Sequence, residues 1–265
     1  SSESFSGKMA SIDEKNCEIE DCDELKMKAA SASCNGNSES SSVTDIVKFL
    51  ELVGNLKHLK RTGWVMRNVK DCESVSGHMY RMSMITFLLD ENSGLNRTKC
   101  MEMALVHDLA ECVVGDITPF CGVSKEEKKL REIRAMEEIC KLIQPFGKRM
   151  LELFLEYEAG ESPESKYVKD LDRLDMLVQA FEYEKRDNCF MKHQEFFDSV
   201  DGKFEHPFVK NMAEEIKRQR EILASGGSIE TNGVPEMIQN GYTNGHHEQE
   251  NSDINGITEK KASSS

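Results

Sequence analysis

Apolar residues recur along this chain with the three- to four-residue spacing of amphipathic helices. The first such stretch has Ile46, Phe49, Leu50 and Val53 on one side, and Thr44 is expected to cap it. Further helices are predicted over residues 73–90, 98–114, 125–143, 148–158, 165–185 and from 207 to about 223. No stretch alternates convincingly with period two, so the sequence predicts an all-α domain.

The segments between these helices carry their own signals. Residues 60–71 form an irregular basic stretch that contains the only tryptophan, Trp64. Gly115 is expected to close the 98–114 helix, and Ser124 with Glu127 reads as a capping box for the next one. A polar loop is predicted between the 165–185 helix and Pro207, which begins the last helix.

The two ends of the chain differ in composition from its middle. Residues 1–42 contain nine acidic and four basic residues, and residues 225–265 contain six acidic and two basic residues. Both ends are poor in aromatic residues, so they cannot bury enough apolar surface to offset the entropy lost on ordering. We therefore expect a disordered acidic N-terminal tail at 1–42, one folded domain over 43–224, and a disordered C-terminal tail at 225–265.

Cysteine usage and charge restrict the class of protein. The nine cysteines are scattered and form no CxxC pair, which favours free thiols in a reducing compartment. No apolar run is long enough for a signal peptide or a membrane span, so an intracellular, cytoplasmic protein is expected. A net charge of −14 without a basic stripe argues against nucleic acid or an anionic membrane as the main partner.

Four residues in three separate predicted helices form a candidate metal site: His78, His107, Asp108 and Asp172. Two imidazoles and two carboxylates are a mixed nitrogen and oxygen set that first-row divalent metals accept. The pair His107-Asp108 directly follows the apolar run 103–106, where burying an unpartnered carboxylate would be costly. A bound cation would account for a carboxylate at this position.

Each candidate also has a simpler explanation. A single histidine on an apolar helix face, such as His78, is more often a hydrogen-bonded core residue than a ligand. Asp172 can be an ordinary surface acid of its helix, and its neighbours Asp170 and Asp175 are rival ligands. Spacing alone therefore leaves the ligand set open.

Several segments of the sequence resemble the HD-domain 5′-deoxynucleotidases, which include bacterial enzymes and the eukaryotic HD-domain-containing protein 2 relatives. The core segments are ESVSGHMYRM, ALVHDLAECVVGDITP and KYVKDLDRLDMLVQAFEYEK, preceded by RTGWVMRNV and followed by GKFEHP. The resemblance covers essentially residues 43–223. One departure is Gly77, where relatives commonly have an acidic residue that could orient the following histidine.

The resemblance implies an HD-domain helical bundle with a metal site between its helices. It implies that His78, His107, Asp108 and Asp172 are the metal ligands, because the alignment of DLDRLDM favours Asp172 over its rivals. The cofactor would be a divalent ion, with Mn, Co, Fe, Zn and Mg all compatible. The resemblance further implies a homodimer.

The resemblance also assigns roles to four residues that have simpler readings on sequence alone. Glu111 lies on the same helix face as His107 and Asp108 and would handle the proton of the attacking water, although a surface acid fits its spacing equally well. Arg61 would bind the phosphate, Trp64 would lie against the C2′ side of the sugar, and Asp116 would bind the 3′-hydroxyl. Without the family, Arg61 reads as a basic loop residue, Trp64 as a core anchor and Asp116 as a turn residue.

Together these observations predict a metal-dependent 5′-deoxynucleotidase that hydrolyses deoxyribonucleoside 5′-monophosphates to deoxyribonucleoside and phosphate. Two alternatives remain open from the sequence. One is an HD-superfamily phosphohydrolase acting on a cyclic or triphosphate nucleotide. The other is a non-catalytic, metal-stabilised module whose tails recruit partners.

Overall fold

The computed structural model describes residues 40–229 and is all-α over that range. It contains no strand there, and its one isolated antiparallel bridge joins Lys60 to Ser74. The chain divides into two compact units, residues 1–220 and 221–265. The predicted tails lie almost entirely outside the described residues, so the proposed domain limits stay a prediction.

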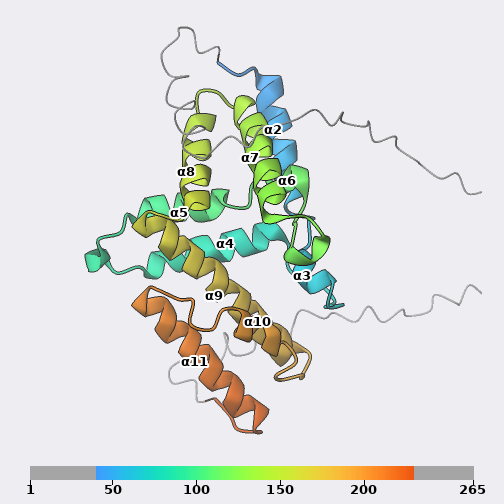
Figure 1. The fold of residues 1–265 in the computed structure, drawn as a ribbon, viewed down its shortest axis with the longest axis vertical. Helices are drawn as coiled ribbons and strands as arrows, with labels where there is room; N and C mark the ends of the chain where they lie inside the picture. Colours follow the sequence, from blue (N-terminus) through green and yellow to red (C-terminus); the bar gives the residue numbers. More distant parts are fainter. Residues whose placement is uncertain (1–39, 230–265) are drawn as a thin grey trace, which may run out of the picture. The chain divides into compact units, whose positions relative to one another are not determined.

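The helices follow the predicted order along the chain (Figure 1). They are α2 (Val43–Asn55), α3 (Thr62–Val65), α4 (Val75–Ile85), α5 (Arg97–Val106), α6 (Glu111–Val114), α7 (Lys125–Lys141), α8 (Gly147–Ala159), α9 (Pro163–Arg186), α10 (Gln194–Ser199) and α11 (Pro207–Ala224). Three short 3-10 helices are η2 (Thr86–Leu88), η3 (Glu91–Ser93) and η4 (Pro119–Cys121). Within the described range no helix combines the length and apolar character needed to cross a bilayer.

The start of α2 differs from the prediction. Ser42, not Thr44, caps this helix: its hydroxyl accepts a hydrogen bond from the Asp45 amide at 3.1 Å, and the Asp45 carboxylate accepts one from the Ser42 amide. The expected inward stripe is also only partly covered, because Leu50 is 60 % exposed and no residue of α2 itself is buried. Among the helices, α2 packs mainly against the short α6, which cannot cover a whole helix face.

The predicted continuous helix over 98–114 is wrong at its centre, where residues 107–110 form a tight turn between α5 and α6. Here backbone amides donate hydrogen bonds to the carbonyls three residues earlier. The Leu109 amide donates to the Val106 carbonyl at 3.0 Å, and the Glu111 amide donates to the Asp108 carbonyl at 3.1 Å. Such 3-10 geometry is tighter than an α-helix. The His-Asp pair therefore lies at the break between two helices.

A group of mutually packed helices carries the candidate site. Helices α5 and α9 contact each other, and each of them also contacts α4 and α8. On the other side of α8 lies α7, and Figure 1 shows these two helices side by side. Met79, Val106, Met136 and Phe154 belong to one buried apolar cluster that joins α4, α5, α7 and α8. Two of the three predicted ligand-bearing segments thus share this core, and the third, α9, packs against both of them.

The C-terminal part of the first unit contains a helix that the sequence analysis missed. Residues 194–199, predicted as loop, form α10, which packs on α9 and buries Phe197. Nearby, Arg220 donates two hydrogen bonds to the buried Glu184 of α9, at 2.6 and 2.8 Å. This pair fixes α9 from the side opposite the core.

Candidate metal centre and adjoining pocket

The structure brings the four predicted ligand residues together. The imidazole Nε2 of His78 lies 3.2 Å from an oxygen of Asp172 and 3.8 Å from an oxygen of Asp108. The Nε2 of His107 lies 3.2 Å from the same Asp108 oxygen. His78, His107 and Asp172 offer ligand atoms that all fall within 4.8 Å of one another. Residues from α4, α9 and the turn after α5 therefore converge on one point.

The two imidazoles have the state expected of metal ligands. Both histidines are buried, and within residues 40–229 neither Nε2 has a partner with hydrogen-bond geometry. The opposite ring nitrogens are occupied: His107 Nδ1 is 2.9 Å from the Ala104 carbonyl, and His78 Nδ1 is 2.7 Å from Asp175. Buried polar atoms are normally satisfied, so two unsatisfied nitrogens facing two carboxylates fit a divalent cation.

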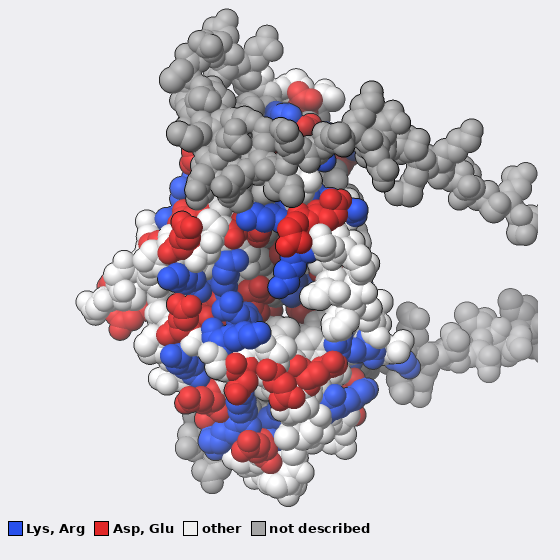
Figure 2. Space-filling model, viewed as in Figure 1, with Lys and Arg blue, Asp and Glu red and all other residues white. Residues whose placement is uncertain are grey.

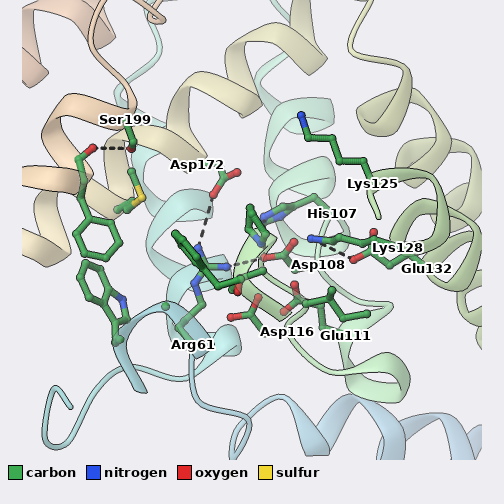
Figure 3. A pocket seen from close by; sticks show the side chains of 18 of the residues that line it. Arg61, His107, Asp108, Glu111, Asp116, Lys125, Lys128, Glu132, Asp172 and Ser199 are labelled. Carbon is green, nitrogen blue, oxygen red and sulfur yellow. Dashed lines mark hydrogen bonds and ion pairs between the residues drawn. The ribbon is translucent and has the colours of Figure 1, made fainter. Parts of the chain in front are cut away.

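The structure separates Asp172 from Asp170, one of its two sequence rivals. Asp170 accepts hydrogen bonds from the backbone amides of Glu205 and His206, at 2.8 and 2.7 Å, and one from Arg173. It holds the chain that leads into α11. The carboxylate of Asp172 instead lies 3.2 Å from Nε2 of His78, and Figure 3 shows its ion pair with Arg61.

Arg61 spans the two candidate ligand carboxylates. Its guanidinium donates a hydrogen bond to Asp108 at 3.2 Å and lies 3.9 Å from Asp172. Burial alone would lower the pKa of Arg61, but the charges of these two carboxylates raise it above its ordinary value. The cation is thus held permanently beside the candidate metal position (Figure 3).

Glu111, the first residue of α6, is 2 % exposed and lines the pocket. Its Oε2 has no hydrogen-bond partner among the described residues. Burial, followed by the charges of Asp108 and Asp116, raises the pKa of Glu111 well above its ordinary value. A buried, unpartnered carboxyl group of this kind is suited to accept or donate a proton.

Asp116 is tied to the start of α3. One of its carboxylate oxygens accepts a hydrogen bond from the Thr62 amide at 2.7 Å, and its carbonyl accepts one from the Thr62 hydroxyl at 2.8 Å. Asp116 also lines the pocket. Sequence reasoning did not include Thr62. Nothing in the local sequence signals its contact with Asp116, which lies 54 residues further along the chain.

Trp64 forms part of the pocket wall but is otherwise packed as a core residue. Its indole nitrogen donates to Glu73 at 3.0 Å, and its ring packs on Phe196 and edge-on to Tyr183, with centroid distances of 4.3 and 5.2 Å. Only 2 % of the residue is exposed. The structure therefore gives Trp64 one pocket-facing surface and a fixed orientation.

The pocket around these residues has a volume of about 740 Å³, which is large enough for a nucleotide. One part of its wall is aromatic and apolar, with Trp64, Ile117, Phe120, Met176 and Phe196. Another part carries charged residues: Lys125, Lys128, Lys129, Lys169, Glu132 and Glu158. Figure 3 shows Lys128 paired with Glu132, an ion pair of 3.5 Å.

Sequence reasoning missed most of these wall residues. Phe196 lies on the unpredicted α10, and the lysines of α7 read as an ordinary solvated helix face. Figure 2 shows basic and acidic side chains interspersed over the face that it presents. Charge pattern alone therefore could not mark which lysines line a pocket.

Comparison with known proteins adds to this geometry. Residues 53–217 match the HD domain. The chain belongs to the HD-domain family. The match includes all four candidate metal ligands and all four residues predicted to act on substrate.

Relatives within the family are similar over most of their length. The chain is 48% identical over 189 residues to a protein of Danio rerio named 5′-deoxynucleotidase HDDC2, covering 71% of this chain and 94% of the relative. It is 43% identical over 202 residues to the Bos taurus 5′-deoxynucleotidase HDDC2, covering 76% and 98%. A Schizosaccharomyces pombe relative, 5′-deoxynucleotidase hdd1, is 41% identical over 182 residues, covering 66% and 90%.

Solved structures of other proteins share the fold. A conserved hypothetical protein from Pyrococcus furiosus superposes with a TM-score of 0.55 at 30% identity, covering 65% of this chain and 99% of that protein. The PH0347 protein from Pyrococcus horikoshii gives the same TM-score at 27% identity, covering 65% and 98%. The predicted all-α HD-domain architecture is confirmed.

Proposed function

We propose that this protein is a metal-dependent 5′-deoxynucleotidase that releases phosphate from deoxyribonucleoside 5′-monophosphates. The observation that carries the proposal is the cluster of two unsatisfied histidine nitrogens and two carboxylates beside Arg61 and the unpartnered Glu111. The relatives named 5′-deoxynucleotidase support it, since the chain covers more than nine-tenths of the Danio rerio relative.

His78, His107, Asp108 and Asp172 would hold the metal, which we take to be one of Mn, Co, Fe, Zn or Mg. When bound, a divalent ion supplies Lewis acidity that polarises a phosphoryl oxygen and makes water a better nucleophile. The donor set of these four residues fits any of these metals, because it combines imidazole and carboxylate groups.

Arg61 and Glu111 would carry out the protein's share of the chemistry. Arg61 already lies between two ligand carboxylates, so its planar fork can also bind the phosphoryl oxygens that gain charge in the transition state. Glu111 would take a proton from the attacking water. As the water oxygen bonds to phosphorus, the P–O5′ bond would break, and Glu111 would pass the proton it took from water to the 5′-oxygen of the deoxyribonucleoside.

Trp64 and Asp116 would select the sugar. Trp64 offers a large, immobilised apolar surface with no hydrogen-bond partner for a 2′-hydroxyl, because indole has no acceptor and its N–H donor is already bonded to Glu73. Asp116, anchored through one oxygen to Thr62, would bind the 3′-hydroxyl with the other. The aromatic wall with Phe196 and Phe120 would then face the base.

We also propose that the protein is a cytoplasmic homodimer. The six cysteines in the described range are free, which suits a reducing compartment. Exposed apolar side chains gather on α4 and η2, where Tyr80, Met84, Phe87 and Leu88 are each about half exposed or more. Light scattering after gel filtration would measure the mass, and a monomer at micromolar concentration would contradict the dimer.

The function is tested by phosphate release from purified, metal-loaded protein. Matched deoxy- and ribonucleoside monophosphates, deoxynucleoside triphosphates and cyclic nucleotides form the substrate panel. Deoxyribonucleoside 5′-monophosphates are expected to react fastest, and Glu111→Gln is expected to lose about 10²- to 10⁴-fold in kcat while retaining the metal. Preference for a triphosphate or cyclic nucleotide would overturn the proposal, as would Glu111→Gln turning over at the wild-type rate.

A further inference from the structure

A polar ladder joins α4 to α9 behind the candidate metal centre. On α4, His78 and Arg81 are three residues apart and share a face. On α9, Asp175, Gln179 and Glu182 follow at spacings of four and three, so they also share a face. These two faces meet, because α4 and α9 are in contact.

Both oxygens of Asp175 are engaged in this ladder. One lies 2.7 Å from Nδ1 of His78, and the other accepts a hydrogen bond from the guanidinium of Arg81. His78 and Asp175 are both completely buried. Arg81 is itself held by Gln179 at 2.7 Å and by Glu182 at 2.8 Å. Asp175 is therefore fixed from two sides and cannot turn toward the pocket without breaking buried contacts.

We propose that Asp175, braced by Arg81, is the positioning residue that sets the tautomer and ring orientation of His78 for metal binding. This inference rests on the proposed metal site. An imidazole whose Nδ1–H is donated to a carboxylate presents the lone pair of Nε2 to the opposite side. Here that opposite side holds Asp172, at 3.2 Å from Nε2.

The carboxylate beside Nδ1 of His78 does not come from a sequence neighbour of this histidine. The resemblance to relatives places an acidic residue at position 77, where this chain has Gly77. A Cβ built on Gly77 would lie nearest the Ser74 hydroxyl, at 3.5 Å, at the start of the same helix. The orienting carboxylate comes instead from α9, 97 residues further along the chain.

Asp175 does not fit a second metal site, although Glu73, His78 and Asp175 offer ligand atoms within 4.8 Å of one another. The guanidinium of Arg81 contacts Asp175 and lies 3.9 Å from Glu73. A fixed guanidinium therefore already lies beside both carboxylates. The atoms of this group are thus accounted for by protein contacts.

Two variants on the same helix separate a positioning role from a structural one. On α9, Asp175 is completely buried and Asp170 is nearly so. The variants Asp175→Asn and Asp170→Asn therefore each remove one negative charge from a buried carboxylate. Asp170 holds backbone amides and has no contact with a histidine ligand. Affinity for Co²⁺ would be measured by titration of its visible absorption, together with the melting temperature of each protein.

We expect Asp175→Asn to weaken Co²⁺ binding by about 10- to 100-fold and to alter the Co²⁺ spectrum. Asp170→Asn should lower the melting temperature and leave the Co²⁺ affinity unchanged. Arg81→Gln should weaken Co²⁺ binding less than Asp175→Asn. Wild-type affinity in Asp175→Asn, or an equal loss of affinity in both aspartate variants, would overturn the inference. A wild-type protein that binds no divalent metal would instead refute the proposed function.

A second measurement needs no variant and so does not depend on folding. In zinc-loaded wild-type protein with ¹⁵N-labelled histidine, NMR reports the protonation of each ring nitrogen. We expect His78 to carry a slowly exchanging proton on Nδ1. A deprotonated or rapidly exchanging Nδ1 would overturn the inference.

Discussion

Sugar selectivity is the most direct test of the pocket wall. Trp64 is held by Phe196 and Tyr183 and by its hydrogen bond to Glu73, so it cannot move aside for a 2′-hydroxyl. Replacing it with phenylalanine keeps an aromatic ring in the core but shortens the wall and removes the indole nitrogen. We expect Trp64→Phe to lower the ratio of kcat/KM for deoxyribonucleotides to that for ribonucleotides.

The size of the effect follows from these contacts. An apolar pocket on its own rejects an added hydroxyl by about a hundredfold. Opening part of the wall should lower the deoxy-to-ribo ratio of kcat/KM about tenfold, equivalent to about 1.4 kcal/mol. Trp64→Ala would open more space but would also cost about 3–5 kcal/mol of stability, a large part of the total for a domain of this size. Phenylalanine is therefore the better probe.

The assay is kcat/KM for dAMP and AMP with each protein at saturating metal. Tyr183→Phe is the matched control, because Tyr183 packs on Trp64 and binds the Glu73 amide but does not line the pocket. That variant should keep the wild-type ratio. An unchanged ratio in Trp64→Phe, or an equal change in Tyr183→Phe, would show that Trp64 is not the wall that selects the sugar.

Three further changes test the remaining parts of the site and the chain. His107→Ala, Asp108→Ala and Asp172→Ala should each lose bound metal, measured by elemental analysis, together with turnover; a variant that retains both is not a ligand. Glu111→Gln should bind metal normally but lose about 10²- to 10⁴-fold in kcat, and a loss confined to KM would argue against proton transfer. A chain shortened to residues 40–229 should keep full-length kinetics, and loss of activity would mean that the removed residues contribute.

The sequence predicted the helices because their periodicity lies within single segments, whereas the convergence of the ligand residues was implied by the family resemblance. Long stretches with period 3.6 gave α4, α7, α8, α9 and α11, although the ends shifted by a few residues. The resemblance singled out Asp172 from its rivals. In the structure the Asp172 carboxylate lies beside Nε2 of His78, which agrees with that choice. The ligand roles themselves stay predictions until metal is measured.

What the sequence did not predict depends on contacts between segments. Helix α10 is only six residues long, too short to show a period. The turn at 107–110 carries no Gly or Pro, so nothing local marked the break. Phe196 and Lys128 entered the pocket wall only through packing of α10 and α7 around the site. Helix α2 had a clear stripe, yet whether a partner helix covers it is a property of the fold.

The six residues 170–175 of α9 carry three acids whose tasks differ completely. Asp170 holds the backbone before α11, Asp172 faces the pocket, and Asp175 faces α4. Successive helical residues are about 100° apart around the axis. Inserting or deleting one residue next to this segment would therefore rotate the three acids by about 100° relative to the part of the helix beyond the change. Exposed side chains of α9 can therefore change without moving these acids, whereas a change in the length of the helix would move them relative to their partners.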